Sequence, residues 1–524
     1  MPSTRAAILC SLLLLSCLLL WTIPAPAQEV QRGALVIQAT RHDLSLPLRD
    51  LAKNPPPLQP HLQTLFPKHP LRFSGSSGVD TAVQRIALPD VSTTNLLSFD
   101  GVSGTVSGGV TPPDTNGAVG GTQFVEIANF DFAVYDKTTG AVVLGPTRIN
   151  TIWSGFGGLC DTTPGGDPVV LWDKTAQRWL LTELAYNGSF TQNFLCVAVS
   201  TSADATGSYN RYAFSFGNTL PDYPKYAIWP DAYYVSVNAF GAGFGEPCAL
   251  DRNAMLAGGT AAMICFPAKS PNSSFLPSDM DGTTPPPAGA PNHYVELGTS
   301  GTSLSEFDFH VDFVTPSNST FTGPHPITVT SYSLACNGGT CIKQPSPGTT
   351  LDSLGDRLMF RLAYRNFGDH ESMVVAHSVK PGSGSTALSA MRWYELRATP
   401  PGGTFSVFQQ GTFQTKAVSL WMGSVAMDKM GNIALGMSGS SASIKPAVLY
   451  TGRVPTDPLG AMESAKIVVK GTGVESGSNR WGDYSSMSVD PSDDCTLWYS
   501  QEYFKTNGTN WQTRLNSFKF NSCH

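Results

Sequence analysis

The stretch DYPKYAIWPDAYYVSVN, residues 222–238, decides the fold of this 524-residue chain. An acidic residue precedes an apolar run, a turn that contains Asp231, and a second run rich in aromatic residues. This pattern is typical of a β-hairpin. It recurs as GDPVVLWDKTAQRWLLT (166–182), WMGSVAMDKMGNIALGM (421–437) and GDYSSMSVDPSDDCTLWYS (482–500), with weaker copies that start at Asp114 and Asp356. The recurrence predicts a protein built from structural repeats.

A second unit follows most of these hairpins and consists of a strand, a turn of small residues and another strand. Its copies cover 132–146, 196–214, 307–329, 394–410 and 447–469. Two successive hairpins make a four-stranded antiparallel sheet, which is the blade of a β-propeller. The interval between the copies at 222 and 356 is about twice the others. We therefore predict an all-β propeller and favour seven blades, with 275–333 as an atypical blade. Six blades with one large insertion is the alternative.

The last blade lacks a strand in this scheme. After its first hairpin, only residues 513–520 resemble a further strand. An unpaired sheet edge is a liability, so propellers close their ring. We expect an N-terminal strand to close it and place that strand at TAVQRIALPDV, residues 81–91.

Composition excludes several classes of protein. Charged residues make up only 14% of the chain, aromatic residues 10%, and there are 51 glycines and 39 prolines. A disordered chain has more charge and fewer aromatics, whereas a helical one has fewer turn residues. The net charge of −6 argues against nucleic acid as a partner.

The N-terminus has the pattern of a secretory signal. Arg5 precedes an apolar run over 6–21, and Ala25-Pro26-Ala27 forms a small-residue cleavage site. We expect a signal peptide over 1–27, a Pro-rich leader or extended arm over 28–77, and a single propeller domain over 78–524. The mature protein is then a secreted or periplasmic monomer with no membrane span.

Eight cysteines remain after removal of that signal, an even number that suggests disulfides in an exported chain. Eight cysteines allow 105 pairings, so the order along the chain does not prove one. We expect neighbours in sequence to pair, as Cys160–Cys196, Cys248–Cys265, Cys336–Cys341 and Cys495–Cys523.

The starts of the repeats are predicted to form the functional site. In a propeller the first strand of each blade lines the central channel, so residues that open these strands form a ring. The carboxylates at this position are Asp114, Asp167, Asp222, Asp356 and Asp483. The polar and aromatic neighbours that we expect to bind a ligand are Tyr223, Lys225, Arg357, Arg480, Trp481 and Tyr484. Trp481 and Tyr484 flank Asp483 and are candidate platforms for stacking a sugar ring.

Three interpretations of this ring remain open. Close carboxylates raise one another's pKa, which suits the acid and base of a glycoside hydrolase or a lyase. Oxygen ligands around an axis also suit Ca²⁺, which is the cofactor that this ring predicts. Alternatively, each Asp caps a turn. We favour a non-catalytic protein that binds a glycan, a cation or an extracellular protein at the acidic mouth. A carbohydrate-active hydrolase or lyase with paired Asp carboxylates is the alternative.

One turn resembles a known motif. Residues 202–208, SADATGS, followed by Tyr209, resemble the Asp-box turn of sialidase-type propellers, with one inserted residue and Tyr in place of Trp. The resemblance implies the fold, because the Asp box is structural in that family. The hairpins at 167, 222, 354 and 480 are similar to uncharacterised secreted bacterial propeller proteins, a resemblance that spans about 110–520 and implies no particular activity.

Overall fold

The computed structural model describes residues 29–31, 33–57, 79–240, 244–267, 273–382 and 387–524. The predicted signal peptide, residues 1–27, lies outside the described residues. Strands dominate the described part, and its helices α1–α4 are short (Leu48–Leu51, Gly104–Ser107, Leu159–Thr162 and Arg252–Ala257). None of the helices in this part is long and apolar enough to cross a membrane.

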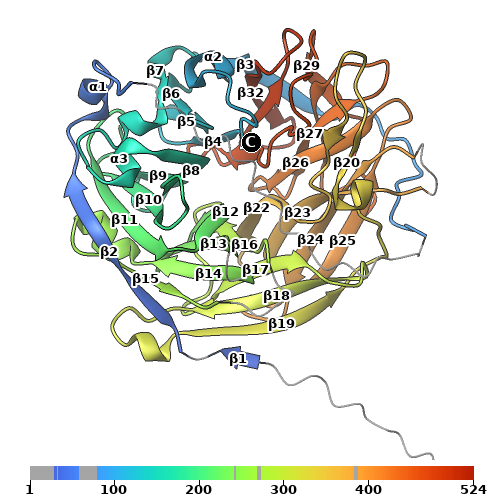
Figure 1. Cartoon of the computed structure of the whole chain (residues 1–524). Helices are drawn as coiled ribbons and strands as arrows, with labels where there is room; N and C mark the ends of the chain where they lie inside the picture. The colour runs from blue at the N-terminus through green and yellow to red at the C-terminus, as the bar shows by residue number, and fades with distance from the viewer. Residues whose placement is uncertain (1–28, 32, 58–78, 241–243, 268–272, 383–386) are drawn as a thin grey trace, which may run out of the picture.

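Seven strands surround a central axis and contact one another in a closed order (Figure 1). In that order they are β4 (Asn116–Val119), β8 (Pro164–Asp173), β12 (Leu220–Ile228), β16 (Leu276–Met280), β22 (Met359–Asn366), β26 (Ser419–Met427) and β30 (Ser486–Val489), which contacts β4 again. Every residue of β4, β16 and β26 is buried. Burial extends to their polar residues, such as Asn116 and Asp279.

Each inner strand continues outward into an antiparallel sheet. The outer strands, in the order in which they follow the inner ones, are β5–β7 (Gln123–Ala128, Asp131–Asp136, Val142–Arg148), β9–β11 (Arg178–Tyr186, Asn193–Ser200, Tyr209–Gly217), β13–β15 (Tyr233–Phe240, Phe244–Leu250, Ala262–Cys265), β17–β19 (Asn292–Leu297, Ser303–His310, Thr320–Thr328), β23–β25 (Glu371–Val379, Ala390–Ala398, Ser406–Phe413), β27–β29 (Ile433–Ser440, Ala447–Arg453, Lys466–Lys470) and β31–β32 (Thr496–Tyr503, Gln512–Phe520). A small two-stranded sheet joins β20 (Thr340–Ile342) to β21 (Leu351–Asp352). The predicted all-β propeller is therefore confirmed.

The number of blades stays a prediction. Counting each inner strand as the start of one blade gives seven. Hydrogen bonding, however, merges some of these units into two nine-stranded sheets, one through β2 (Leu35–Leu44) and the other through the parallel pairing of β16 with β22.

An N-terminal strand closes the ring, but it is not the segment that the sequence suggested. Strand β3 (Thr93–Ser103) pairs antiparallel with β32 and completes the sheet β3-β32-β31-β30. Residues 81–91 make only isolated bridges, from Val83 to Thr412 and from Asp90 to Ser464. They run past other blades before β3 begins. The prediction that this segment closes the ring was therefore wrong, and the closing strand is the next segment along the chain.

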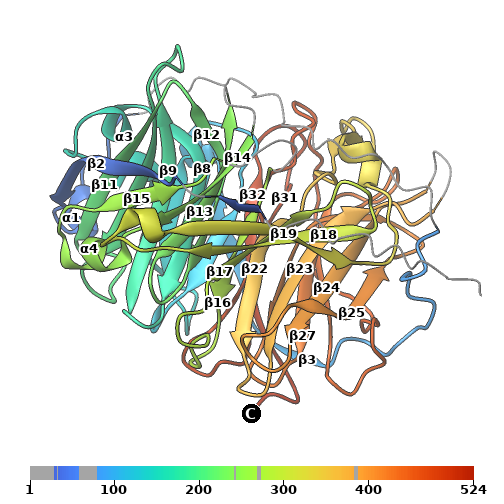
Figure 2. The same cartoon turned by 90° about the horizontal axis from the view of Figure 1, so that it is seen from below.

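The described part of the 28–77 segment contributes strands to the outside of the ring. Strand β2 (Leu35–Leu44) pairs antiparallel with β11 on one side and β15 on the other, and β1 (Glu29–Gln31) pairs with β19. Figures 1 and 2 show β2 lying along the outer edge beside β11 and β15. The segment behaves as an arm that joins two neighbouring units through backbone hydrogen bonds.

All four predicted disulfides are present. Cys248 and Cys265 are direct partners in the pairing of β14 with β15. Disulfides persist in oxidising compartments, so four of them are consistent with an extracellular protein.

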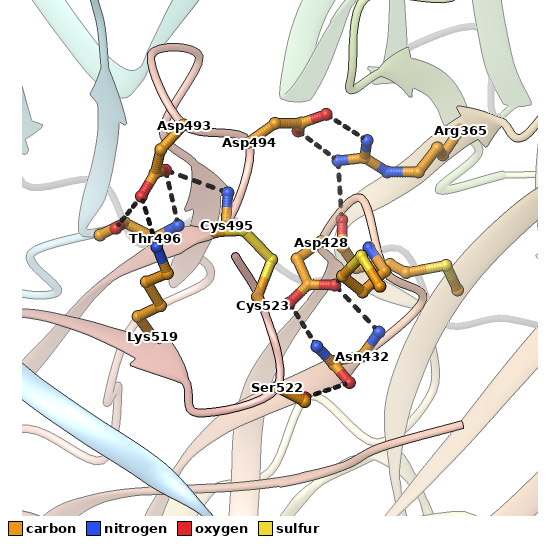
Figure 3. The surroundings of a disulfide bond; sticks show 12 residues. Arg365, Asp428, Asn432, Asp493, Asp494, Cys495, Thr496, Lys519, Ser522 and Cys523 are labelled. Carbon is orange, nitrogen blue, oxygen red and sulfur yellow. Dashed lines mark hydrogen bonds and ion pairs between the residues drawn. A yellow bond between two sulfur atoms is a disulfide. The ribbon is translucent and has the colours of Figure 1, made fainter. Parts of the chain in front are cut away.

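The Cys495–Cys523 bond links the ends of two adjacent strands of the last sheet (Figure 3). Cys495 precedes β31 and Cys523 follows β32. Asp493 accepts the backbone N–H of Cys495 at 3.0 Å, and Asp494 makes two hydrogen bonds of 2.7 Å with Arg365 of β22. The disulfide, the turn before β31 and a neighbouring blade thus form one connected unit.

Removing this disulfide is expected to destabilise the protein. Replacing Cys495 and Cys523 together with alanine should lower the free energy of unfolding by about 2–5 kcal/mol, because the unfolded chain regains the freedom of a long loop. Denaturant unfolding monitored by tryptophan fluorescence measures the change. The matched control is the Cys336–Cys341 bond, which spans only 5 residues. Its removal should cost roughly 1 kcal/mol less, and equal losses would contradict the explanation by loop entropy.

Candidate active site

The inner strands share an irregularity near their starts. Register shifts interrupt β8 between Gly166 and Val169, β12 between Asp222 and Lys225, and β26 between Trp421 and Ser424. Within these bulges Asp167, Tyr223 and Met422 adopt left-handed backbone conformations with φ of 51°, 56° and 51°. Asp114, just before β4, has φ of 48°. Such conformations are costly for non-glycine residues and concentrate at functional sites, where a bulge redirects a side chain.

These bulges bring together side chains from several blades, which we call the axial cluster. Its members are Asp114, Asp167, Asp222, Asp356, Asp483, Tyr223, Lys225, Arg357, Arg480 and Tyr484. All of them were predicted site residues. Their convergence follows from their shared place in the repeat.

Asp114 and Asp483 join the first and last blades of the ring. Asp114 Oδ1 accepts the backbone N–H of Asp483 at 2.6 Å, while its Oδ2 accepts from the Asn129 amide at 2.5 Å. Asp483 is held by two hydrogen bonds of 2.6 and 2.7 Å from Arg480. Asn129 also accepts the backbone N–H of Asp167 at 2.9 Å. Sequence reasoning missed Asn129, because its role depends on contacts between blades.

Asp167 makes the equivalent connection to the next blade. Its Oδ2 accepts the backbone N–H of Tyr223 at 3.1 Å and the hydroxyl of Tyr484 at 3.4 Å. Asp167 and Asp222 are half-buried as whole residues. Asp114, in contrast, is 2% exposed.

The basic side chains lie among the carboxylates and tyrosines. Lys225 is fully buried, with Nζ 3.1 Å from the ring centroid of Tyr223 and 3.2 Å from that of Tyr484. Arg357 also contacts the ring of Tyr223, with Cζ 4.8 Å from the ring centroid. Its guanidinium pairs with Asp356 at 2.9 Å. Cation–π contacts of this kind fix the position of a buried cation.

Burial and like charge raise the pKa values of Asp167, Asp222 and Asp114. Loss of hydration is the largest cause for Asp167 and raises its pKa to about 7, with the charge of Asp222 next in importance. Loss of hydration, followed by repulsion from Asp483, raises the pKa of Asp222 to about 6. For Asp114, burial and then Asp483 raise the pKa well above its usual range. Burial lowers the pKa of Lys225 against the attraction of Asp167.

Trp481 does not belong to the exposed site. Its ring is 0% exposed, lies 5.4 Å from that of Trp421, and donates its indole N–H to Ser438 at 3.0 Å. It therefore packs in the core between blades, and its predicted stacking on a sugar is wrong. Tyr484 is 1% exposed and packs against Lys225, so its predicted stacking on a sugar is wrong as well.

The chemistry of the axial cluster differs from that of a calcium site. Calcium prefers six to eight oxygen ligands. Here Arg480 holds Asp483, Arg357 holds Asp356, and Lys225 lies close to Asp167. Positive side chains thus lie beside the carboxylates that a calcium ion would need as ligands. Asp167, which accepts hydrogen bonds from Tyr223 and Tyr484, and Asp222 differ in pKa, as acid–base chemistry requires.

A separate cavity of about 350 Å³ lies at the opposite ends of the inner strands. Its lining includes Trp172, Lys174 and Asp494. Lys174 follows β8, whereas Asp167 lies near the start of that strand. The two features therefore occupy opposite ends of the channel.

The Asp-box-like turn is structural in this protein. Asp204 Oδ1 accepts the backbone N–H and the hydroxyl of Thr206 at 2.9 and 2.8 Å. The turn lies between β10 and β11. Its carboxylate caps the turn and takes no part in the axial cluster.

Comparisons with known proteins give only remote likenesses. Neither a family profile nor a curated protein matches the chain. The α-L-arabinofuranosidase Arb93A from Fusarium graminearum is 8% identical with a TM-score of 0.37, over 82% of this chain and 99% of that one. Polysaccharide lyase Uly1 is 12% identical with a TM-score of 0.36, over 83% and 100%.

A third structure, the WD40 domain of SCAP from fission yeast, is 9% identical with a TM-score of 0.31, over 77% of this chain and 82% of that one. Two of these three proteins are carbohydrate-active enzymes, and none is a sialidase. At these TM-scores the likeness is too loose to transfer a site or an activity.

Proposed function

We propose that the protein is a carbohydrate-active enzyme, a glycoside hydrolase that uses Asp167 and Asp222 at the mouth of the channel. One observation carries the proposal: the pKa values of two half-buried aspartates are raised to about 7 and about 6, and the charge of Asp222 contributes to the shift of Asp167. Glycoside hydrolysis needs one carboxyl group that is protonated and one that is ionised near neutral pH. The pair meets that requirement without a further group.

The two carboxyl groups then have different roles. Asp167, with the higher pKa, holds a proton that it donates to the glycosidic oxygen as the bond to the leaving sugar breaks. Asp222, ionised above pH about 6, acts on the opposite side of the sugar as the base or the nucleophile. Arg480 and Lys225 supply positive charge that keeps both pKa values from rising further.

A non-catalytic binding protein is the second candidate. It is favoured by the hydrogen bonds that Asp114 and Asp167 accept from the backbone of neighbouring blades. Carboxylates used in this way hold the ring together and leave the mouth as a polar surface for a glycan or an extracellular protein. In this case the raised pKa values are a consequence of burial alone.

A polysaccharide panel separates these candidates. Purified mature protein is incubated with neutral and uronate-containing polysaccharides, and new reducing ends and unsaturated products are measured. New reducing ends without unsaturation support the hydrolase. Unsaturated products would instead indicate a lyase, which cleaves by elimination. Tight binding without turnover on any member of the panel would favour the binding protein.

The activity is expected to depend on pH in a bell-shaped manner. Below pH about 6 Asp222 gains a proton and its activity as base or nucleophile is lost. Above pH about 7 Asp167 loses the proton that it must donate. Because the groups are coupled, the two limbs report the pair. The profile of kcat/KM against pH should therefore peak between about 6 and 7 and fall about tenfold per pH unit on either side. A flat profile across this range would contradict the assignment.

A further inference from the structure

Four ionisable side chains lie together on one face of the sheet formed by β17, β18 and β19. In the register of these strands His293 is opposite Asp308, and Glu306 is opposite His325. Glu306 and Asp308 are two residues apart in β18, so they share a face of the sheet. We call these four residues the β17–β19 cluster. None of them belongs to the axial cluster.

Three ligand atoms of this cluster converge on one point. The His293 ring nitrogen and one oxygen from each of Glu306 and Asp308 all lie within 4.8 Å of one another. His293 Nδ1 is 2.8 Å from Glu306 Oε1 and 2.9 Å from Asp308 Oδ1.

A single proton cannot serve both carboxylates. Nδ1 carries at most one hydrogen, which is directed at one acceptor. Glu306 Oε1 is its hydrogen-bond partner, and within the described part of the chain Asp308 Oδ1 has no hydrogen bond. Two carboxylates therefore face one nitrogen in a buried place, where the ring of His293 supplies at most one positive charge for the two.

The surroundings hold the ring of His293 in place and leave one side open. Its ring packs edge-on against Phe405, with centroids 4.8 Å apart, and lies 6.4 Å from Trp229. The Asp308 side chain is 32% exposed, so an ion can enter from that side. His325 Nε2 lies 3.4 Å from the second oxygen of Asp308, where it orients the carboxylate.

We propose that the β17–β19 cluster binds a divalent zinc ion through His293 Nδ1, Glu306 and Asp308. Imidazole nitrogen together with carboxylate oxygen is a donor set that zinc accepts, and sites with three protein ligands keep a fourth position for water. Calcium, in contrast, favours larger sets of oxygen ligands. An ion with two positive charges balances both carboxylates, which a shared proton does not.

The test measures metal binding by the whole mature protein. The protein is stripped with chelator, titrated with zinc chloride by calorimetry, and its metal content after dialysis is determined by mass spectrometry. We expect about one zinc per chain and little response to calcium chloride. His293→Ala and Glu306→Gln should each weaken zinc binding at least about tenfold.

The matched control is His310→Ala, because His310 is an exposed histidine on the same strand, two residues after Asp308. This variant should bind zinc like the wild-type protein. Glu306→Gln keeps an oxygen that can accept a hydrogen bond from Nδ1, so it is expected to fold even if His293→Ala does not. Absence of zinc binding by the wild type, or unchanged affinity in Glu306→Gln, would overturn the proposal.

Discussion

Replacing Asp167 with asparagine is expected to lower kcat/KM on the polysaccharide substrate by roughly 100- to 10,000-fold, the usual contribution of a general acid or base. The amide oxygen can still accept the N–H of Tyr223 and the hydroxyl of Tyr484, which hold the carboxylate now. The amide cannot give up a proton to a leaving sugar. Steady-state kinetics on the substrate found in the polysaccharide panel measure the loss, with circular dichroism to show that the fold is retained.

Two further variants sharpen this test. Asp222→Asn should cause a loss of similar size, because it removes the partner that must be ionised. Asp136→Asn changes a carboxylate that caps a turn after β6, through hydrogen bonds to Thr138 and Thr139, and should leave kcat/KM unchanged. Full activity in Asp167→Asn would show that Asp167 only joins blades and that other residues carry out the reaction.

The repeat made most of the fold predictable. The hairpins that start near Asp167, Asp222 and Asp483 repeat one order of acidic residue, strand, Asp-containing turn and aromatic-rich strand, so they could be aligned with one another. The closing strand could not be found in this way. Residues 93–103 form a partly exposed edge with little apolar alternation, whereas the apolar pattern of 81–91 drew the prediction to the wrong segment.

The site was predictable to the extent that it follows the repeat. Asp114, Asp167 and Asp222 occupy one repeat position, and the structure places them within electrostatic reach of Asp483. What the sequence could not indicate depends on contacts between distant segments. The burial of Lys225 between two tyrosine rings is of this kind, and so is the pairing of Glu306 with His325.

The segment before the closing strand contains a buried ion pair, and breaking it is expected to be strongly destabilising. Arg392 of β24 is 0% exposed and donates to Asp80 Oδ1 at 2.5 Å. Its Nε donates to Thr412 at 2.6 Å, and Thr412 in turn donates to the second oxygen of Asp80 at 2.9 Å. This network attaches the start of the 81–91 segment to the ring, together with the isolated bridge from Val83 to Thr412.

Asp80→Ala should therefore lower the free energy of unfolding by about 3–5 kcal/mol, because it leaves the guanidinium of Arg392 buried without its partner. The double variant Asp80→Ala/Arg392→Met should recover much of this loss, since no buried charge remains. Denaturant unfolding of the three proteins measures both effects. The control is Asp50→Ala, which breaks the exposed pair with Lys53 and should cause no measurable change, because solvent screens such pairs. If Asp80→Ala cost less than about 1 kcal/mol, water would have to reach Arg392, and the attachment would depend on the bridges of Val83 and Asp90 instead.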